Sequence, residues 1–182
     1  MKPNFTSGNV LLRREQCKST KTSPRYQKSP ELKGLEQLSL EAKRQKYPNN
    51  PYLVGETFED RTANGLTKAI VAYMRLTGAY AERVNTMGRP IDRSKTFVDV
   101  MGHVRTIGSI DWIKGGGQKG SADVHSCVNG KTVMIEIKVG SDKQSPAQKA
   151  YQKSIESAGG LYFIAKDFAS FHSWFNQLIE KP

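Results

Sequence analysis

The sequence predicts a mixed α/β domain in which helices flank a central sheet. Asn129-Gly130 joins two runs that alternate apolar and polar residues, which is the strongest short signal for a β-hairpin with a two-residue turn. Ser145-Pro146 opens a segment with a helix-start pattern, and an almost wholly apolar run follows at 161–165. Such a run is typical of a buried strand that lies parallel to its neighbour after a right-handed crossover.

Residues 1–50 are predicted to form a basic N-terminal arm. They hold eleven Lys and Arg residues against four Glu, which is +7 of the net charge of +11, and the first 30 or so show no apolar period. Ser29-Pro30 favours the start of a helix that reaches about Lys46, where Pro48 and Pro51 interrupt it. Such an arm would bind phosphate groups without sequence preference, and a solvated tail is the alternative.

Residues 51–182 are predicted to form one folded domain. Residues 62–77 place apolar side chains at helical spacing, and Gly78 suits the position after a helix end. Extended structure is expected next in three stretches: 79–85, 96–101 and 103–111. The chain ends in a helical pattern whose large side chains are expected to cover the sheet: Phe168, Phe171, Trp174, Phe175 and Leu178.

The hairpin register brings charged residues together. With Asn129 and Gly130 as the turn, paired residue numbers sum to 259, so Asp123 faces Glu136, and Lys138 lies on the same face. Like charges directly opposite one another destabilise a strand pair, and a cation such as Mg²⁺ between the two carboxylates relieves the repulsion. Valine and isoleucine residues of both strands point the other way, toward a core. A surface hairpin with solvated Glu136 and Lys138 is the alternative.

Three nearby features each have two interpretations. The glycine-rich loop at 115–120 leads to Asp123 and allows close approach to a phosphodiester, with Lys114 and Lys119 adding charge, or it is a plain turn. Gln148 completes a capping box with Ser145, and its other interpretation, a place near the acidic residues, comes only from the family resemblance that follows. His125 shares the face of Asp123 and is expected to be a satisfied residue of the cleft rather than a DNA contact.

The stretch Lys119-Gly120-Ser121-Ala122-Asp123, the triplet Glu136-Ile137-Lys138 and Gln148 resemble the VRR-NUC branch of the PD-(D/E)XK nucleases. The resemblance covers roughly residues 61–175. It implies a restriction-endonuclease-like mixed sheet and a Mg²⁺-dependent endonuclease, with Mn²⁺ as a substitute ion. It also implies DNA as the partner, with junction, flap or branched DNA as substrates, and a homodimer as in junction-resolving relatives.

The same resemblance implies roles for individual residues. Asp123 and Glu136 would hold the metal together with the Ile137 carbonyl, while Lys138 and Gln148 would complete the catalytic set. The basic side chains expected to contact nucleic acid are Lys114, Lys119 and Arg83. Two departures stand out: Ala122 replaces the family's proline, and the stretch 62–66 lacks the acidic residue that many relatives carry on their first helix, offering only Asn64.

Other function classes fit less well. A nucleic-acid-binding module that has lost cleavage is the second interpretation, and a basic structural or packaging protein is the third. Cys17 and Cys127 lie far apart without metal-ligand spacing, so neither a disulfide framework nor a zinc site is expected. The sequence shows no apolar run of ~18 residues and no secretory signal, so a reducing cytosol is the expected compartment.

Overall fold

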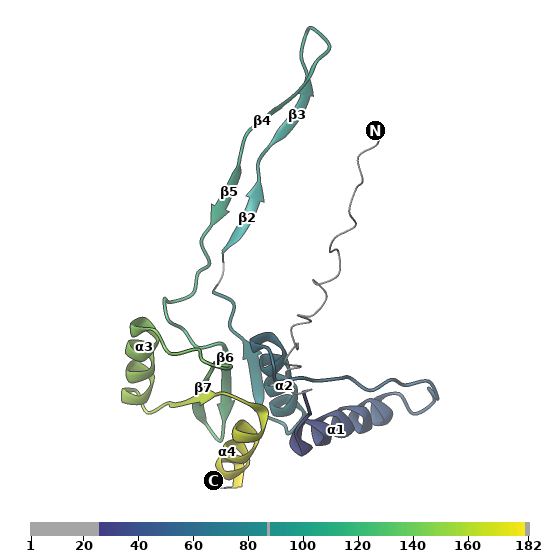
Figure 1. Ribbon diagram of the computed structural model, residues 1–182, viewed down its shortest axis with the longest axis vertical. Coiled ribbons are helices and arrows are strands. Elements are labelled where there is room, and N and C mark those ends of the chain that lie inside the picture. The colour runs from purple at the N-terminus through teal and green to yellow at the C-terminus, as the bar shows by residue number, and fades with distance from the viewer. Residues whose placement is uncertain (1–25, 87, 181–182) are drawn as a thin grey trace, which may run out of the picture.

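The computed structural model describes residues 26–86 and 88–180. A four-stranded sheet forms the centre of the domain, and a long two-stranded ribbon projects away from it (Figure 1). The sheet has the order β1-β6-β7-β8, with strands β1 (Tyr80–Arg83), β6 (Val124–Val128), β7 (Lys131–Ile137) and β8 (Leu161–Ala165). The helices are α1 (Pro30–Lys46), α2 (Ala63–Leu76), α3 (Pro146–Ser157) and α4 (Phe168–Glu180). The mixed α/β prediction is confirmed.

The central hairpin, β6–β7, has the predicted turn and register. Asn129 and Gly130 both have left-handed backbone angles, φ 50° and φ 73°, as a type I′ turn requires. Val128 pairs with Lys131 and Val124 with Ile135, so the pair numbers sum to 259. The alternation of the strands therefore sends one set of side chains into the core and the acidic set to the opposite face.

One face of the sheet packs against α2 and α4, and α1 packs in turn against these two helices. Val124, Val133 and Ile135 are buried there, in a cluster that includes aromatic residues of α4. Phe168, Phe171 and Phe175 are fully buried, and Tyr73 of α2 meets Phe168 edge-on with ring centroids 5.8 Å apart. The predicted aromatic stripe is thus confirmed as core. The other face is covered by α3, which buries no residue of its own and leaves a polar layer against the sheet.

Helix α1 belongs to this core although it lies within the basic segment 1–50. Ser29 caps it by accepting a hydrogen bond from Leu32 N at 3.2 Å, and the predicted helix is confirmed. Leu32 and Leu35 are buried in the same cluster as the sheet. Most of the predicted arm, residues 1–25, lies outside the described residues.

Several predicted strand boundaries were wrong. The strand expected at 79–85 is limited to β1, four residues long. The stretches 96–101 and 103–111 lie in the ribbon, which consists of β2 (Arg89–Asp92), β3 (Lys95–Val98), β4 (Val104–Ile107) and β5 (Ile110–Ile113). Strand β8 runs parallel to β7 as predicted but is only half-buried, because it forms an edge of the sheet. No helix in the described ranges has the length and apolar character needed to cross a membrane.

Candidate active site

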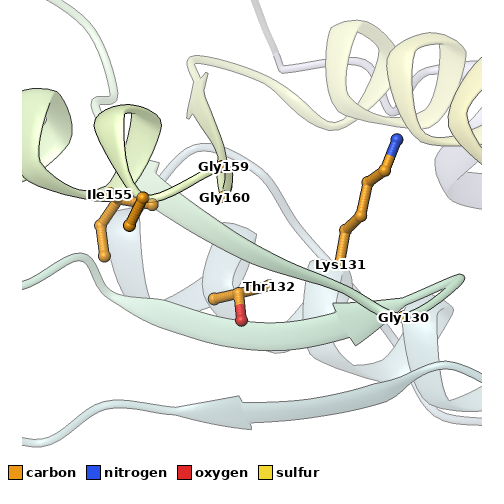
Figure 2. A pocket seen from close by; sticks show the side chains of 7 residues that line it. Gly130, Lys131, Thr132, Ile155, Gly159 and Gly160 are labelled. Atoms are coloured by element: carbon orange, nitrogen blue, oxygen red, sulfur yellow. The ribbon is translucent and has the colours of Figure 1, made fainter.

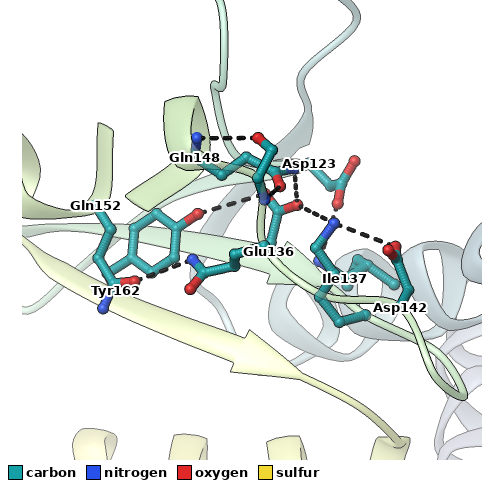
Figure 3. Close-up of polar contacts among 10 residues, drawn as sticks. Asp123, Glu136, Ile137, Asp142, Gln148, Gln152 and Tyr162 are labelled. Atoms are coloured by element: carbon teal, nitrogen blue, oxygen red, sulfur yellow. Dashed lines mark hydrogen bonds and ion pairs between the residues drawn. The ribbon is translucent and has the colours of Figure 1, made fainter. Parts of the chain in front are cut away.

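The open end of the β6–β7 hairpin carries the candidate site (Figure 3). Asp123 directly precedes β6, Glu136 lies in β7, and Lys138 follows that strand. Asp123 is fixed across the hairpin because its Oδ2 accepts a hydrogen bond from Ile137 N at 2.9 Å. The structure therefore brings Asp123, Glu136 and Lys138 together on one side of the sheet, as the register predicted.

Glu136 is the most enclosed acidic side chain of the site, with an exposed fraction of 1%. Three groups donate to its carboxylate: the amide of Gln148, Lys138 Nζ at 3.2 Å and Tyr162 OH at 3.3 Å. Burial raises the pKa of this carboxyl, and the neighbouring charge of Asp123 raises it further. The interpretation of a solvated surface hairpin is wrong, since both Glu136 and Lys138 are buried.

Lys138 supplies a positive charge between two acidic residues. Its ammonium lies 3.2 Å from Glu136 Oε1 and 3.1 Å from Asp142 Oδ2. Burial by itself lowers the pKa of Lys138, but hydrogen bonds and charges of Asp142 and Glu136 outweigh it, so the pKa is raised. Lys138 consequently stays protonated at neutral pH. It is suited to stabilise negative charge and unsuited to act as a general base.

Gln148 combines the two roles that its sequence position left open. Its side-chain oxygen accepts from Ser145 N at 2.8 Å, and Ser145 Oγ accepts from Gln148 N at 3.3 Å, which completes the capping box. The side-chain nitrogen of the same amide donates to Glu136 Oε1. The residue that begins α3 is therefore also a residue of the site.

Two members of the cluster were missed from the sequence. Tyr162 lies in β8, and burial and the charge of Glu136 raise its pKa, so its hydroxyl keeps the proton that it donates. In the sequence, only its position as the one hydroxyl-bearing residue of the apolar run 161–165 could have indicated this role. Asp142 lies four residues beyond Lys138 on an exposed turn, and only the fold shows that it reaches that ammonium. Gln152, four residues beyond Gln148 on α3, accepts from Gln144 at 3.0 Å.

The predicted nucleic-acid contacts lie outside this cluster. Lys114 and Lys119 are exposed in the loop before Asp123. Arg83, at the end of β1, donates to Asn64 Oδ1 at 2.7 Å. His125 also faces β1, where its Nδ1 lies 3.5 Å from Glu82 Oε1, in keeping with a satisfied residue.

The glycine-rich loop packs closely against α3. Gly120 has φ 85°, and a Cβ at this position would lie 2.6 Å from the carbonyl group of Ala147. Any larger residue would push the loop away from the first turn of α3, which carries Gln148. The structure thus explains Gly120 by a contact within the protein, whereas Gly116 faces open space.

The carboxylate oxygens of the site suit a hard divalent cation that is bound by only one or two protein ligands. No group of three or more His, Cys, Asp or Glu side chains suited to a metal was found in residues 26–86 and 88–180. Mg²⁺, however, binds through one or two carboxylates while it keeps several waters. An ionised carboxylate offers about four acceptor sites, so Glu136 retains about one beyond its three donors, and Asp123 retains more. The Asn64 oxygen is engaged by Arg83.

A hollow at the other end of the hairpin is separate from this cluster (Figure 2). It lies between the turn and the end of α3, where Gly160 packs so closely that a Cβ would lie 2.8 Å from Ile155 Cγ2. The Lys131 side chain extends away from Ile155. None of the acidic residues described above lines this hollow.

No known protein family matches the chain, and no curated protein sequence resembles it significantly. The geometry of the site is therefore the basis for its function.

Proposed function

We propose that the chain is a Mg²⁺-dependent DNA endonuclease with a restriction-endonuclease-like fold, related to the VRR-NUC branch. One observation carries the proposal. Glu136 is buried beside Asp123 and against the ammonium of Lys138, on the open end of a hairpin. Stability alone does not account for two acidic residues here, because a buried carboxylate with a raised pKa is costly to ionise.

The residues divide the catalytic tasks. Asp123 and Glu136, with the Ile137 carbonyl, would hold Mg²⁺ or Mn²⁺, which when bound supplies an activated water and polarises a phosphoryl oxygen. Lys138 stabilises the negative charge that develops on the phosphate, because its raised pKa keeps it an ammonium. Gln148 and Tyr162 hold the Glu136 carboxylate in place, since both donate to it.

DNA is the substrate class that the charge distribution favours. The chain carries a net charge of +11, and residues 1–25 contribute six Lys and Arg residues against one Glu. Exposed Lys114 and Lys119 precede Asp123 in the chain and place further positive charge on the loop that leads to it. Selectivity for junction, flap or branched DNA and a homodimeric state follow from the resemblance alone.

A binding module without cleavage is the second candidate. It is favoured by the start of α2, where Asn64 stands in place of an acidic ligand and its oxygen already accepts from Arg83. A basic packaging protein is disfavoured, because such a protein needs no buried cluster of two acidic residues and a lysine.

A cleavage assay with purified protein separates these candidates. Linear, flapped and four-way DNA are incubated with Mg²⁺, Mn²⁺ or a chelator. The proposal predicts metal-dependent cleavage that is lost in Glu136→Ala and Lys138→Ala while DNA binding is retained. Binding without cleavage under every metal condition would favour the module.

A further inference from the structure

The ribbon formed by residues 89–113 is one continuous antiparallel pair. Arg89 pairs with Ile113 and Val98 with Val104, and every pair in β2–β5 and β3–β4 sums to 202. Ten residues per strand at about 3.3 Å each give a length of roughly 33 Å. The ribbon stands clear of the sheet and of the helices, and its second strand leads through residues 114–122 to Asp123 (Figure 1).

Neither face of the ribbon is covered by the rest of the domain. Nine of the fourteen large hydrophobic residues that are exposed in the described ranges lie between Phe97 and Ile113. An isolated two-stranded ribbon is marginally stable in water unless something packs against it. The ribbon therefore has the composition of a contact surface.

The cations of the ribbon all lie on one face. Side chains alternate along each strand, so the odd-numbered residues of both strands share a face. That face carries all four Lys and Arg residues of the ribbon: Arg89, Arg93, Lys95 and Arg105. Two aspartates on the same face pair with Arg93 at 3.0 Å and Arg105 at 2.6 Å, which leaves a net charge of 4 − 2 = +2. The even-numbered face has no Lys or Arg, and its one acidic residue is Asp92.

The tip of the ribbon presents apolar side chains on an ordered turn. Asp99 Oδ1 accepts from Met101 N at 2.9 Å and from His103 N at 3.0 Å. Val100 and Met101 point into solvent with exposed fractions of 103% and 76%. Apolar side chains held by an ordered turn can contact base edges in the major groove, such as the methyl group of thymine.

We propose that the ribbon is an arm that binds duplex DNA next to the cleavage site, with its odd-numbered face on the phosphates and its tip against the bases. The inference rests on the proposed function, because it places the ribbon beside a nuclease site. A two-stranded ribbon fits the major groove, and its length of roughly 33 Å matches about one helical turn of duplex. Because residues 114–122 join the ribbon to Asp123, a duplex held along it reaches the site.

The test measures DNA binding in chelator, so that its outcome does not depend on cleavage. Two cations of the ribbon, Arg93 and Arg105, are paired with Asp111 and Asp99. The variant Arg89→Ala/Lys95→Ala removes the other two, which form no ion pair with either aspartate. The matched control Lys33→Ala/Lys131→Ala removes two exposed lysines on α1 and the hairpin turn. Circular dichroism verifies that both variants fold.

We expect the ribbon variant to bind a 24-base-pair duplex about tenfold more weakly, with a log–log salt slope shallower by about 2, and the control to stay within about twofold. Equal binding of both variants to this duplex would overturn the proposal.

The alternative to DNA is that a second copy of the chain packs against the even-numbered face of the ribbon. Sedimentation of Ile110→Lys addresses it, because Ile110 is exposed at the centre of that face. The proposal predicts the same mass and the same DNA affinity as the wild type. Dissociation of a wild-type dimer by Ile110→Lys would overturn it. If the ribbon variant binds more weakly but the wild type never cleaves DNA, the arm is supported and the nuclease proposal is wrong. If the protein cleaves DNA and Arg89→Ala/Lys95→Ala binds as well as the wild type, the nuclease proposal stands and the arm is wrong.

Discussion

Gln148 joins the start of α3 to Glu136 through a single amide. Its oxygen accepts from the backbone of Ser145 and its nitrogen donates to the Glu136 carboxylate. Because capping fixes the rotamer, the donor is held in place before any ligand binds. The position of α3 therefore helps to set where the Glu136 carboxylate lies.

Substitutions at the two ends of the capping box should separate stability from activity. Ser145→Ala and Gln148→Ala each remove a cap contact and should each cost about 1 kcal/mol of unfolding free energy. Only Gln148→Ala removes the donor to Glu136, and it should lower single-turnover cleavage by about 10–100-fold. Thermal unfolding and quenched-flow kinetics on both variants provide the comparison. Equal rates for the two would refute a role of Gln148 beyond the cap.

Glu136 should destabilise the metal-free protein when it is ionised. Its folded pKa is raised above its ordinary value of 4.5 by burial and by Asp123. The folded state holds this proton more tightly than the unfolded state does, and this stabilises the protein. The stabilisation is fully present below pH 4.5 and is lost as the pH rises through the raised pKa of Glu136. Glu136→Gln should raise the Tm in chelator at pH 8 by about 2–4 °C, as ~1 kcal/mol does in a domain of this size.

The wild type and Glu136→Gln also test where Mg²⁺ binds. Mg²⁺ should raise the Tm of the wild type at pH 8 and leave that of Glu136→Gln unchanged, because the substitution removes a charged ligand. At pH 4, where Glu136 is protonated in both folded and unfolded chains, the two proteins should respond alike to Mg²⁺. A Mg²⁺ response of Glu136→Gln equal to that of the wild type would place the ion elsewhere.

Lys138→Met should be strongly destabilising at neutral pH. It leaves the buried Glu136 carboxylate without its cation, and breaking a buried ion pair in this way costs about 3–5 kcal/mol. Asp142→Asn changes the exposed partner of the same ammonium and should cost less than about 1 kcal/mol. Urea unfolding of both variants measures the difference. Similar losses would mean that the Lys138–Glu136 contact contributes little.

Deleting residues 1–25 should weaken DNA binding without affecting the fold. The deletion removes six cations and one acid, whereas the core residues Leu32 and Leu35 remain. The log–log salt slope should become shallower by up to about 5, at about 0.9 per phosphate contact, while the Tm changes little. Anisotropy titrations at several salt concentrations measure the slope. Unchanged affinity would make the segment a solvated tail.

The parts of the fold that local patterns determine could be predicted from the sequence. Asn129-Gly130 fixes a turn type and hence a register, and that register placed Asp123 opposite Glu136. Ser145 and Gln148 fix a helix start in the same way. These signals act over a few residues, so no knowledge of the tertiary fold is needed to interpret them.

Features that depend on distant contacts could not be predicted. Tyr162 joins the site only because β8 lies parallel to β7, and Asp142 only because its turn brings it to Lys138. The ribbon was read as separate extended stretches, because nothing local shows that residues 89 and 113 pair outside the sheet. For the glycine-rich loop at 115–120 the sequence leaves a phosphate approach and a plain turn open, and the close contact of Gly120 with α3 depends on the tertiary fold.

Single-turnover cleavage by Asp123→Asn is the decisive measurement for a metal site between Asp123 and Glu136. Asparagine keeps an oxygen to accept from Ile137 N, so the hairpin end stays in place while one negative charge is lost. With wild-type and variant protein saturated with DNA in Mg²⁺, we expect the variant to cleave about 100-fold or more slowly at unchanged DNA affinity. Equal rates for the two proteins, or a wild type that never cleaves DNA in Mg²⁺ or Mn²⁺, would contradict it.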